Sequence, residues 1–553
     1  MRGMRPWRGS PCLSSPGSGR RWRRRWRFMV DGVTRGDEAG TLAVSTGAAE
    51  PGRGTDAGAA AVAPIRGRDA RPRLAFYGDD FTGSTDTLAA AVLGGWRAAL
   101  FMDVPSAEDL RRHGELDCIG VAGSARSMAP AEMDRVLPRI FAGLAATGAA
   151  VLHYKTCSTF DSAPHIGSIG HATALARGAL AETVSARPVF IVGGQPNLGR
   201  YCAYANLYAR AGQDGRIYRI DRHPTMSCHP VTPMDEADLR VHLGRQGLQA
   251  LSFDAEMLEL PAGEQDARLD AMLNSGAEAV LFDVTRPAHL AAIGRLLCAR
   301  CPSAGPLLAA GPTGVVQALL AASSVVPHAA AESAVADAAL VPAAASPATA
   351  AGGTVSVAQT FIMAGSRSPV TAAQIKRAEQ DGFVSVGVDP AALASHGERK
   401  DDEPVDDSSH GDRGQPSIQT QDTITGVLIQ ITEALRAGRS VVAHTTFADA
   451  SAAARPGFTQ ALAIGSGRLM KEVLRRHPLQ RVGFAGGDTS SLAVQSWGIT
   501  ALTLAYVLAP GVAVCRIDAP GQPLDGVELM LKGGQMGPPT LFSDLLAGVS
   551  FRA

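Results

Sequence analysis

The stretch LAFYGDDFTGSTDTLAAA, residues Leu74–Ala91, joins a short apolar run to a helical pattern through two adjacent aspartates. An apolar run of this length predicts a buried strand, and the periodic segment after it predicts a helix. In open α/β sheets, ligands bind just beyond the carboxyl ends of the strands. One aspartate can cap the helix, but capping does not need both. The stretch therefore predicts an α/β fold with a site at Asp79 and Asp80.

Short apolar runs separated by helical periods continue along the chain. In the first part, the predicted buried strands are LAFYG, AALFMD, CIGVAG, VLHYK and PVFIVGG. Later, TVSVAQTFIMAGSRSPVTAAQIKRAEQDG predicts a strand, a Gly-Ser turn and a helix, with Ser368 as the N-cap. The strands SVVAHT and RVGFAGG flank a helix from about Gln460 to Arg476. Such alternation indicates parallel sheets. We therefore expect two α/β domains with largely parallel sheets that face a shared cleft.

Composition divides the chain into segments. Residues 71–322 and 354–553 are the two expected domains, and a Pro/Ala-rich linker at 323–353 separates them. Residues 396–421, rich in Asp, Glu, Ser and Gly, are an expected disordered insertion in the second domain. Residues 1–70 are rich in Arg, Gly and Ala. They fit a targeting or nucleic-acid-binding arm, a transit peptide or a disordered extension, and we favour the extension because nothing there can form a core.

The overall composition excludes several function classes. The 553 residues carry a formal net charge of zero, which argues against a chain that binds nucleic acid or anionic membranes as a whole. No apolar run is long enough to span a bilayer. The eight scattered cysteines do not form a disulfide framework. We expect a cytoplasmic protein that binds small molecules, has no nucleic-acid or membrane partner, and can form a homo-oligomer.

Polar side chains follow three of the predicted strands in the first domain. Two adjacent carboxylates can activate a hydroxyl, hold a magnesium ion or bind sugar hydroxyls. Arginine suits bidentate recognition of a carboxylate. Strand ends with these residues predict a pocket for a small, hydroxylated acid. The residues that carry this prediction are Asp79, Asp80, Thr82, Arg126, Lys155, Ser158 and Asp161.

Glycine-rich stretches mark the second domain. Glycines let the backbone approach a ligand closely, and free N–H groups at a helix start favour anionic oxygens. Each stretch alone also fits an ordinary tight turn, but together they favour nucleotide binding. No Walker A motif is present and no GxGxxG follows a strand, so another loop type must hold the phosphates. The stretches are AGSRSP (364–369), FAGGDTSS (484–491), LAPGVAVCR (508–516) and LKGGQMGPP (531–539).

Several of these motifs, in this order, resemble the four-carbon acid sugar kinases. The motifs are YGDDFTGSTD, KTCSTFDS, GSRSPVTAAQI, GGDTSS and LKGGQMG. The resemblance implies that residues 71–322 bind a sugar acid and residues 354–553 bind ATP, whose phosphate goes to the terminal hydroxyl of the acid. The wording KTCSTFDS is similar to the 3-oxo-tetronate kinase branch. Threonate, erythronate and branched 3-oxo-isoapionate remain alternative substrates.

The resemblance also implies roles for individual residues, with ATP and Mg²⁺ as cofactors and no protein residue assigned to the metal. Asp80 and Asp79 would be catalytic. Thr82, Arg126, Lys155, Ser158 and Asp161 would bind the acid. The nucleotide would lie among Ser366, Ser368, Gly486, Gly487, Asp488, Thr489, Gly533, Gly534 and Gln535. Two other classes compete with this interpretation, a regulator that binds the ligands without chemistry and a nicotinamide-dependent dehydrogenase, and the missing fingerprint disfavours the dehydrogenase.

Overall fold

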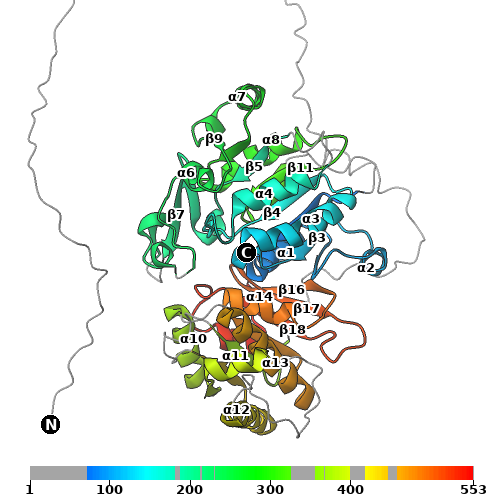
Figure 1. Ribbon diagram of the computed structural model, residues 1–553, viewed down its shortest axis with the longest axis vertical. Helices are drawn as coiled ribbons and strands as arrows, with labels where there is room; N and C mark the ends of the chain where they lie inside the picture. Colours follow the sequence, from blue (N-terminus) through cyan, green and yellow to red (C-terminus); the bar gives the residue numbers. More distant parts are fainter. Residues whose placement is uncertain are drawn as a thin grey trace, which may run out of the picture. The chain divides into compact units, whose positions relative to one another are not determined.

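Parallel strands form the framework of the computed structural model, which describes residues 71–180, 187–211, 215–229, 231–324, 355–365, 368–398, 418–445 and 457–551 (Figure 1). The predicted extension 1–70 and most of the predicted linker lie outside these ranges. We call residues 71–324 the N-terminal half and residues 355–551 the C-terminal half. Within the described ranges, fifteen strands form one sheet. No described helix combines the length and the apolar composition needed to cross a membrane.

The N-terminal half contributes the strand order β2-β3-β1-β4-β11-β5-β10-β9, in which all neighbours are parallel. Both faces are buried, since Phe76 of β1 belongs to one core and its neighbour Tyr77 to another. This explains the continuous apolar runs in the sequence. The strands are β1 (Leu74–Gly78), β2 (Ala98–Phe101), β3 (Cys118–Ala122), β4 (Val151–Lys155), β5 (Val189–Val192), β9 (Ala250–Phe253), β10 (Ala279–Phe282) and β11 (Leu307–Gly311).

Helices pack on both faces of these strands. The core that contains Phe76 includes residues of α1, α8 and α9, and the core that contains Tyr77 includes residues of α3, α4 and α6. The α/β class and the largely parallel sheets are thus confirmed. The helices are α1 (Phe81–Leu93), α2 (Ala107–His113), α3 (Pro130–Ala146), α4 (Ile169–Gly178), α6 (Leu239–Gly244), α7 (Ala262–Asn274), α8 (Pro287–Cys298) and α9 (Gly314–Ser324).

A small antiparallel sheet in the N-terminal half was not predicted. It consists of β6 (Arg200–Ala203), β7 (Asn206–Ala211) and β8 (Arg216–Arg219). The turn between β6 and β7 holds Tyr204 and Ala205 at positive φ, which is unfavourable for residues with a Cβ. The buried Asp283 carboxylate accepts hydrogen bonds from both of their N–H groups. These bonds offset the strain of the turn.

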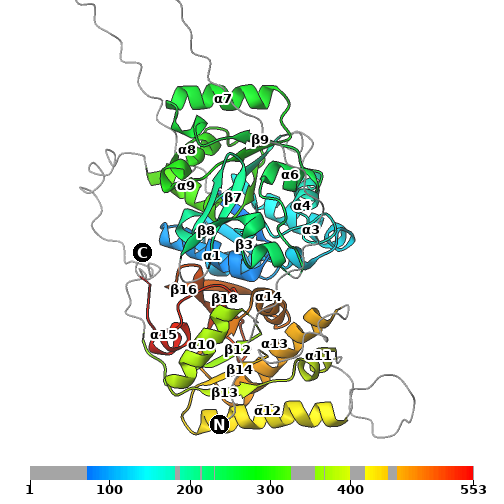
Figure 2. The same ribbon diagram turned by 90° about the vertical axis from the view of Figure 1, so that its left-hand side faces the viewer.

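The C-terminal half contributes the parallel order β13-β14-β12-β15-β18, followed by β17 and β16 in antiparallel pairing. Successive β12 residues face opposite cores, since Phe361 packs with α11–α13 and Ile362 with α10 and α15. Figure 2 shows α10 beside α15. The elements are β12 (Phe361–Ala364), β13 (Val384–Gly387), β14 (Val441–His444), β15 (Arg481–Ala485), β16 (Ala501–Ala509), β17 (Val512–Asp518), β18 (Glu528–Lys532), α10 (Pro369–Gln380), α11 (Pro390–Glu398), α12 (Ile418–Arg436), α13 (Phe458–Arg476), α14 (Gly487–Gln495) and α15 (Leu541–Ala547).

Two expectations about the C-terminal half change. The stretch LAPGVAVCR forms the hairpin turn between β16 and β17, where Gly511 has a φ of 71°. It therefore differs from FAGGDTSS, which leads from β15 into α14. The expected insertion 396–421 is too wide at both ends, because α11 runs to Glu398 and α12 begins at Ile418. Both helices contribute apolar residues to the core. Residues 399–417 lie outside the described ranges.

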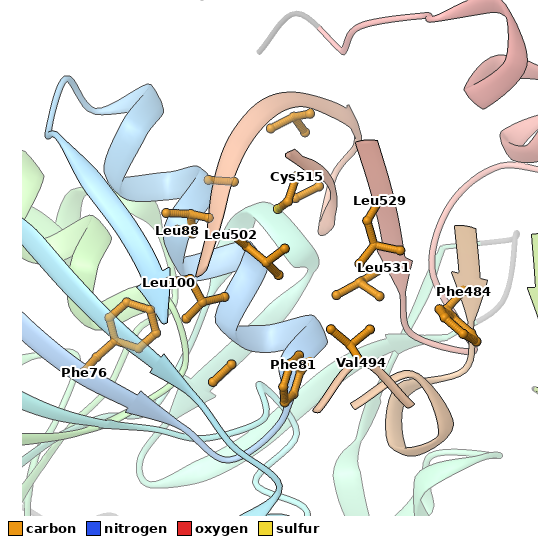
Figure 3. Packing of buried hydrophobic residues seen from close by; sticks show 14 of the residues in the cluster. Phe76, Phe81, Leu88, Leu100, Phe484, Val494, Leu502, Cys515, Leu529 and Leu531 are labelled. Atoms are coloured by element: carbon orange, nitrogen blue, oxygen red, sulfur yellow. The ribbon is translucent and has the colours of Figure 1, made fainter. Parts of the chain in front are cut away.

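The two halves meet through β16 and β2, which pair antiparallel at Ala501 with Phe101 and at Leu502 with Leu100. A single apolar cluster continues across this junction, from Phe81 and Leu88 of α1 to Leu529 and Leu531 of β18 (Figure 3). Helix α1 also contacts α14, β16 and β17 (Figure 1). The first helix of the N-terminal half is therefore buried by the last strands of the C-terminal half.

We predict that Leu502→Ala destabilises both halves together. Leu502 is fully buried in the shared cluster, and truncating such a leucine costs about 2–5 kcal/mol. The matched control is Leu93→Ala, because the Leu93 side chain at the end of α1 is mostly exposed. Urea unfolding followed by circular dichroism and tryptophan fluorescence tests this prediction. Equal midpoints for the two variants would contradict it.

Candidate functional site

Two carboxylates with different surroundings follow β1. Asp80 caps α1, and its Oδ1 accepts a hydrogen bond of 3.1 Å from the Gly83 N–H. Asp79 is buried; its Oδ2 accepts a 3.3 Å bond from the Cys157 N–H, while its Oδ1 has no partner among the described residues. Burial, together with the neighbouring charge of Asp80, raises the pKa of Asp79 to about 7. Helix capping thus accounts for one aspartate only.

Cations from two neighbouring strand ends surround Asp80. The Arg126 Nη1 atom lies 3.3 Å from Asp80 Oδ2 and 4.0 Å from Asp161 Oδ2. The Lys155 Nζ atom is buried and lies 3.8 Å from Asp80 Oδ1. The structure therefore brings together Asp80, Arg126, Lys155 and Asp161 from the ends of β1, β3 and β4.

Glycine makes this close approach possible at the start of α1. A Cβ placed on Gly83 would lie 1.9 Å from Lys155 Nζ and 2.5 Å from Asp80 Oδ1. Any larger residue would therefore push the lysine away from the carboxylate. The parallel register also brings these residues together. Gly78, the last residue of β1, pairs with Ala122 and Lys155, the last residues of β3 and β4, so the three strands end at one level.

Several buried polar atoms around these charges lack partners. Among the described residues, Thr82 Oγ1 and Asp161 Oδ1 have none, like Asp79 Oδ1. Ser158 lies half-buried in the turn after β4. A buried polar atom without a partner costs about 1–3 kcal/mol, so such atoms are rare outside ligand sites. The arrangement can thus receive hydroxyl and carboxylate groups of a small polar ligand.

Sequence reasoning missed a second polar group beside α1. The Asp86 Oδ2 atom accepts hydrogen bonds from Gln195 Nε2 at 2.8 Å and from Thr313 Oγ1 at 2.6 Å. Gln195 follows β5 and Thr313 follows β11. Gln195 comes directly after the two glycines of the predicted strand PVFIVGG, and Thr313 comes two residues after Gly311; these glycines were the available signal. These bonds tie two further strand ends to the helix that begins at the paired aspartates.

Two glycine stretches of the C-terminal half reach the same end of α1. The Phe81 N–H donates to Ser491 Oγ of α14 at 3.1 Å. A Cβ placed on Gly487 would lie 3.1 Å from Arg126 Nη2, and one placed on Gly533 would lie 3.8 Å from Thr82 Cγ2. The FAGGDTSS and LKGGQMG stretches therefore lie against the paired-aspartate site.

The other residues expected to bind the nucleotide lie at the start of α14, after β18 and at the start of α10, and one lies outside the described residues. Gly486 precedes α14, and its N–H donates to the Lys532 carbonyl at 2.9 Å. Asp488 and Thr489 lie in the first turn of α14, while Gly534 and Gln535 follow β18. Ser368 caps α10 as expected, accepting from the Val370 N–H at 3.1 Å. Ser366 lies outside the described residues.

Lys532, beside the two glycines, is turned away from the loop. Its ammonium is fully buried and donates to Thr371 Oγ1 at 2.8 Å and to Gln374 Oε1 at 2.7 Å, both on α10. Burial lowers the pKa of Lys532 to about 7. This lysine therefore differs from the lysine of a Walker A loop, which reaches the phosphates of the nucleotide.

The chemistry of the site suits a magnesium ion that arrives with a phosphate ligand. Among the described residues, no group of three or more His, Cys, Asp or Glu side chains has a metal-binding arrangement. Magnesium commonly takes one or two carboxylates and completes its shell with phosphate and water oxygens. The unpartnered carboxylate oxygens of Asp79 and Asp161 fit that requirement.

Comparison with known proteins identifies both halves. A family model described as a sugar-binding N-terminal domain matches residues 74–319, and one described as a nucleotide-binding C-terminal domain matches residues 361–542. The 3-oxo-isoapionate kinase of Paraburkholderia graminis is 37% identical over 495 residues, covering 86% of this chain and 94% of that protein. The 3-oxo-tetronate kinase of Cupriavidus necator is 29% identical over 488 residues, covering 86% and 97%.

A solved structure matches the fold. The crystal structure of a Salmonella typhimurium LT2 protein described as a tRNA synthase has a TM-score of 0.61 at 21% identity, covering 85% of this chain and 98% of that chain. At this identity the likeness concerns the fold alone, and the synthase description belongs to that protein. The resemblance seen in the sequence motifs is confirmed by the two domain matches and by the kinase relatives. The chain belongs to the four-carbon acid sugar kinase family.

Proposed function

We propose that the protein is an ATP-dependent kinase that transfers the γ-phosphate to a hydroxyl of a 3-oxo acid sugar. The observation that carries this proposal is the contact between the two halves. Glycine stretches of the nucleotide-binding half, at Gly487 and Gly533, lie against Arg126 and Thr82 of the sugar-binding half. A phosphate bound by those loops would face the acceptor hydroxyl beside the aspartates.

The two aspartates divide the work in this proposal. Both Asp80 oxygens are engaged, with the Gly83 N–H and Lys155 on one side and Arg126 on the other. Asp79 has an unpartnered oxygen and a pKa raised by burial to about 7. A general base works best when its pKa lies near the working pH. We therefore assign the proton of the attacking hydroxyl to Asp79, and the positioning of Lys155 and Arg126 to Asp80.

Charge neutralisation is the other requirement of phosphoryl transfer. Arg126 lies between Asp80 and Gly487, so its guanidinium can contact the transferred phosphoryl group. When bound, Mg²⁺ neutralises charge on the ATP phosphates, and the unpartnered Asp161 oxygen is the protein donor that we assign to it. Thr82 and Ser158 are assigned to hydroxyls of the acid. The use of ATP and a small acid supports a cytoplasmic location for the reaction.

The relatives order the candidate substrates. Identity is 37% to a 3-oxo-isoapionate kinase and 29% to a 3-oxo-tetronate kinase. The higher identity makes branched 3-oxo-isoapionate, which the motif comparison gave as an alternative, the first candidate substrate, and linear 3-oxo-tetronate the second. The 3-oxo group and the carboxylate are common to both, so Arg126 and Lys155 fit either acid.

We predict that ADP release from ATP and Mg²⁺ is stimulated most by 3-oxo-isoapionate in a panel of acids. The panel also contains 3-oxo-tetronates, threonate and erythronate, and a reaction without acid measures basal hydrolysis. A coupled assay gives kcat and KM for each acid. Stimulation by none of them, with ADP still bound tightly, would contradict the kinase assignment and support the ligand-binding regulator.

We predict that Asp79→Asn lowers kcat by about 10²- to 10⁴-fold, the usual contribution of a general base. The affinity for ADP should remain near that of the wild type, because the glycine loops are unchanged. The control is Asp117→Asn, since Asp117 is also buried but precedes β3 at the opposite end of the strands. Steady-state kinetics and ADP titration test this prediction. Wild-type turnover in Asp79→Asn would remove Asp79 from the mechanism.

We also predict that Asp79→Asn raises the melting temperature at pH 8, and that the gain disappears toward pH 4. The pKa of Asp79 is raised from 3.8 to about 7 in the folded protein. Between these values the folded chain holds a proton that the unfolded chain has released, so this contribution to stability is lost as the pH rises. Asparagine does not ionise, so the Asp79→Asn variant does not lose this stability as the pH rises.

Thermal unfolding at pH 4, 6 and 8 measures this dependence. Asp109→Asn is a control for which the opposite pH dependence of stability is expected, because hydrogen bonds from Ser106 lower the pKa of Asp109. Its substitution should cost stability at pH 8 and little at low pH. A melting difference for Asp79→Asn that does not change with pH would show that Asp79 ionises normally.

A further inference from the structure

The motifs GSRSPVTAAQI and LKGGQMG contain three polar residues with no role in the site described so far, namely Thr371, Gln374 and Lys532. All three are fully buried, and Lys532 hydrogen-bonds to the other two. The Lys532 ammonium has no carboxylate within ion-pair distance among the described residues. A buried ammonium is costly when it is not paired. Its presence among neutral oxygens therefore calls for a reason other than stability.

The ammonium fixes the direction of two hydrogen-bond chains. Gln374 Oε1 carries no hydrogen and accepts from Lys532 Nζ, and Thr371 Oγ1 accepts from the same nitrogen. The Gln374 amide is then oriented with its NH₂ group toward the loop after β18, and the Thr371 hydroxyl is left to donate. Lys532 thus sets the orientation of both side chains.

Those two side chains hold four carbonyl groups of the loop 533–538. Thr371 Oγ1 donates to the Gly534 carbonyl at 3.2 Å. Gln374 Nε2 lies 3.0, 3.2 and 3.0 Å from the carbonyl oxygens of Met536, Gly537 and Pro538. The carbonyl side of the loop therefore faces α10.

The opposite side of the loop consequently presents N–H groups. In a trans peptide unit the N–H points away from the preceding carbonyl, and no described peptide bond is cis. The N–H groups of Gln535 and Gly537 thus point away from α10, and neither has an acceptor among the described residues. Gly533 in the same loop lies next to Thr82. Outward N–H groups in a glycine turn form an anion-binding concavity.

We propose that Thr371, Gln374 and Lys532 are positioning residues that turn the N–H groups of Gln535 and Gly537 toward the phosphate oxygens of the nucleotide. This inference rests on the proposed kinase function, since it assigns the loop to ATP. The three residues act through the loop and do not touch the nucleotide. The loop also requires glycine at position 537, because the φ there is 84° and a Cβ would lie 2.8 Å from Leu541.

The test is Gln374→Glu in the full-length protein. The carboxylate can still accept from Lys532, but it cannot donate to the three carbonyls and it repels them. We expect the Kd for ADP, measured by titration calorimetry, to rise about tenfold or more. The KM for ATP should rise in parallel, whereas the KM for the acid sugar should stay within about twofold, because the acid lies on the other half. A purely structural role would move all these constants and the melting temperature together.

The matched control is Gln265→Glu on α7. The Gln265 amide has the same pattern of bonds, since Oε1 accepts from Arg295 while Nε2 donates to the carbonyls of Leu258 and Leu260. This site lies in the N-terminal half, so ADP affinity should not change. Thr371→Val and Thr371→Ser form a second pair, in which only the valine variant loses the hydroxyl and should weaken ADP binding.

The outcomes separate the two proposals. Wild-type affinity for ADP in both Gln374→Glu and Thr371→Val would overturn the positioning role while the kinase assignment stands. No ADP binding by the wild-type protein would overturn the assignment of the loop to a nucleotide, and with it the proposed function. Weakened ADP binding in Gln374→Glu and Thr371→Val, with normal binding in Gln265→Glu and Thr371→Ser, supports the positioning cluster.

Discussion

Burying two adjacent carboxylates is the constraint on which the rest of this structure depends. Asp79 and Asp80 are both nearly inaccessible to water, and a buried charge is tolerated only when cations and hydrogen-bond donors surround it. The chain supplies Arg126, Lys155 and the first turn of α1 to Asp80. Among the described residues, Asp79 receives one N–H, which does not offset the effect of burial and of the neighbouring Asp80 charge, so its pKa is raised. The same shortage of partners makes Asp79 available for a proton.

Helix α1 connects the two aspartates with the C-terminal half. Phe81 begins the helix directly after Asp80, and its N–H is bound by Ser491 of α14. Leu88, further along α1, lies in the apolar cluster that continues into β18 (Figure 3). The pairing of β2 with β16 extends the sheet across the same boundary. Packing around one helix therefore sets how the glycine loops meet the aspartates.

The sequence could predict elements whose signal is local. Buried parallel strands give continuous apolar runs, which is why LAFYG and VLHYK correspond to β1 and β4. The hairpin of β16 and β17 was missed because a glycine turn looks the same before a strand as before a helix. The group of Asp86, Gln195 and Thr313 was missed for another reason. It exists because β11 lies between β4 and β5, and strand order is a long-range property that composition and periodicity do not encode.

Two lysines show why a side chain's role depends on its partners and not only on its motif. Lys155 and Lys532 each end a strand and are both buried, Lys155 against Gly83 of α1 and Lys532 directly before Gly533. Lys155 lies near the carboxylate of Asp80, so its charge is balanced where ligand chemistry is expected. Within the described part of the chain, Lys532 hydrogen-bonds to neutral oxygens only, and burial lowers its pKa to about 7. A lysine beside two glycines predicts a phosphate ligand from sequence, yet here the ammonium faces inward. In the proposed arrangement, the hydrogen bonds from Lys532 orient Thr371 and Gln374, and through them the backbone, so that peptide N–H groups form the anion site.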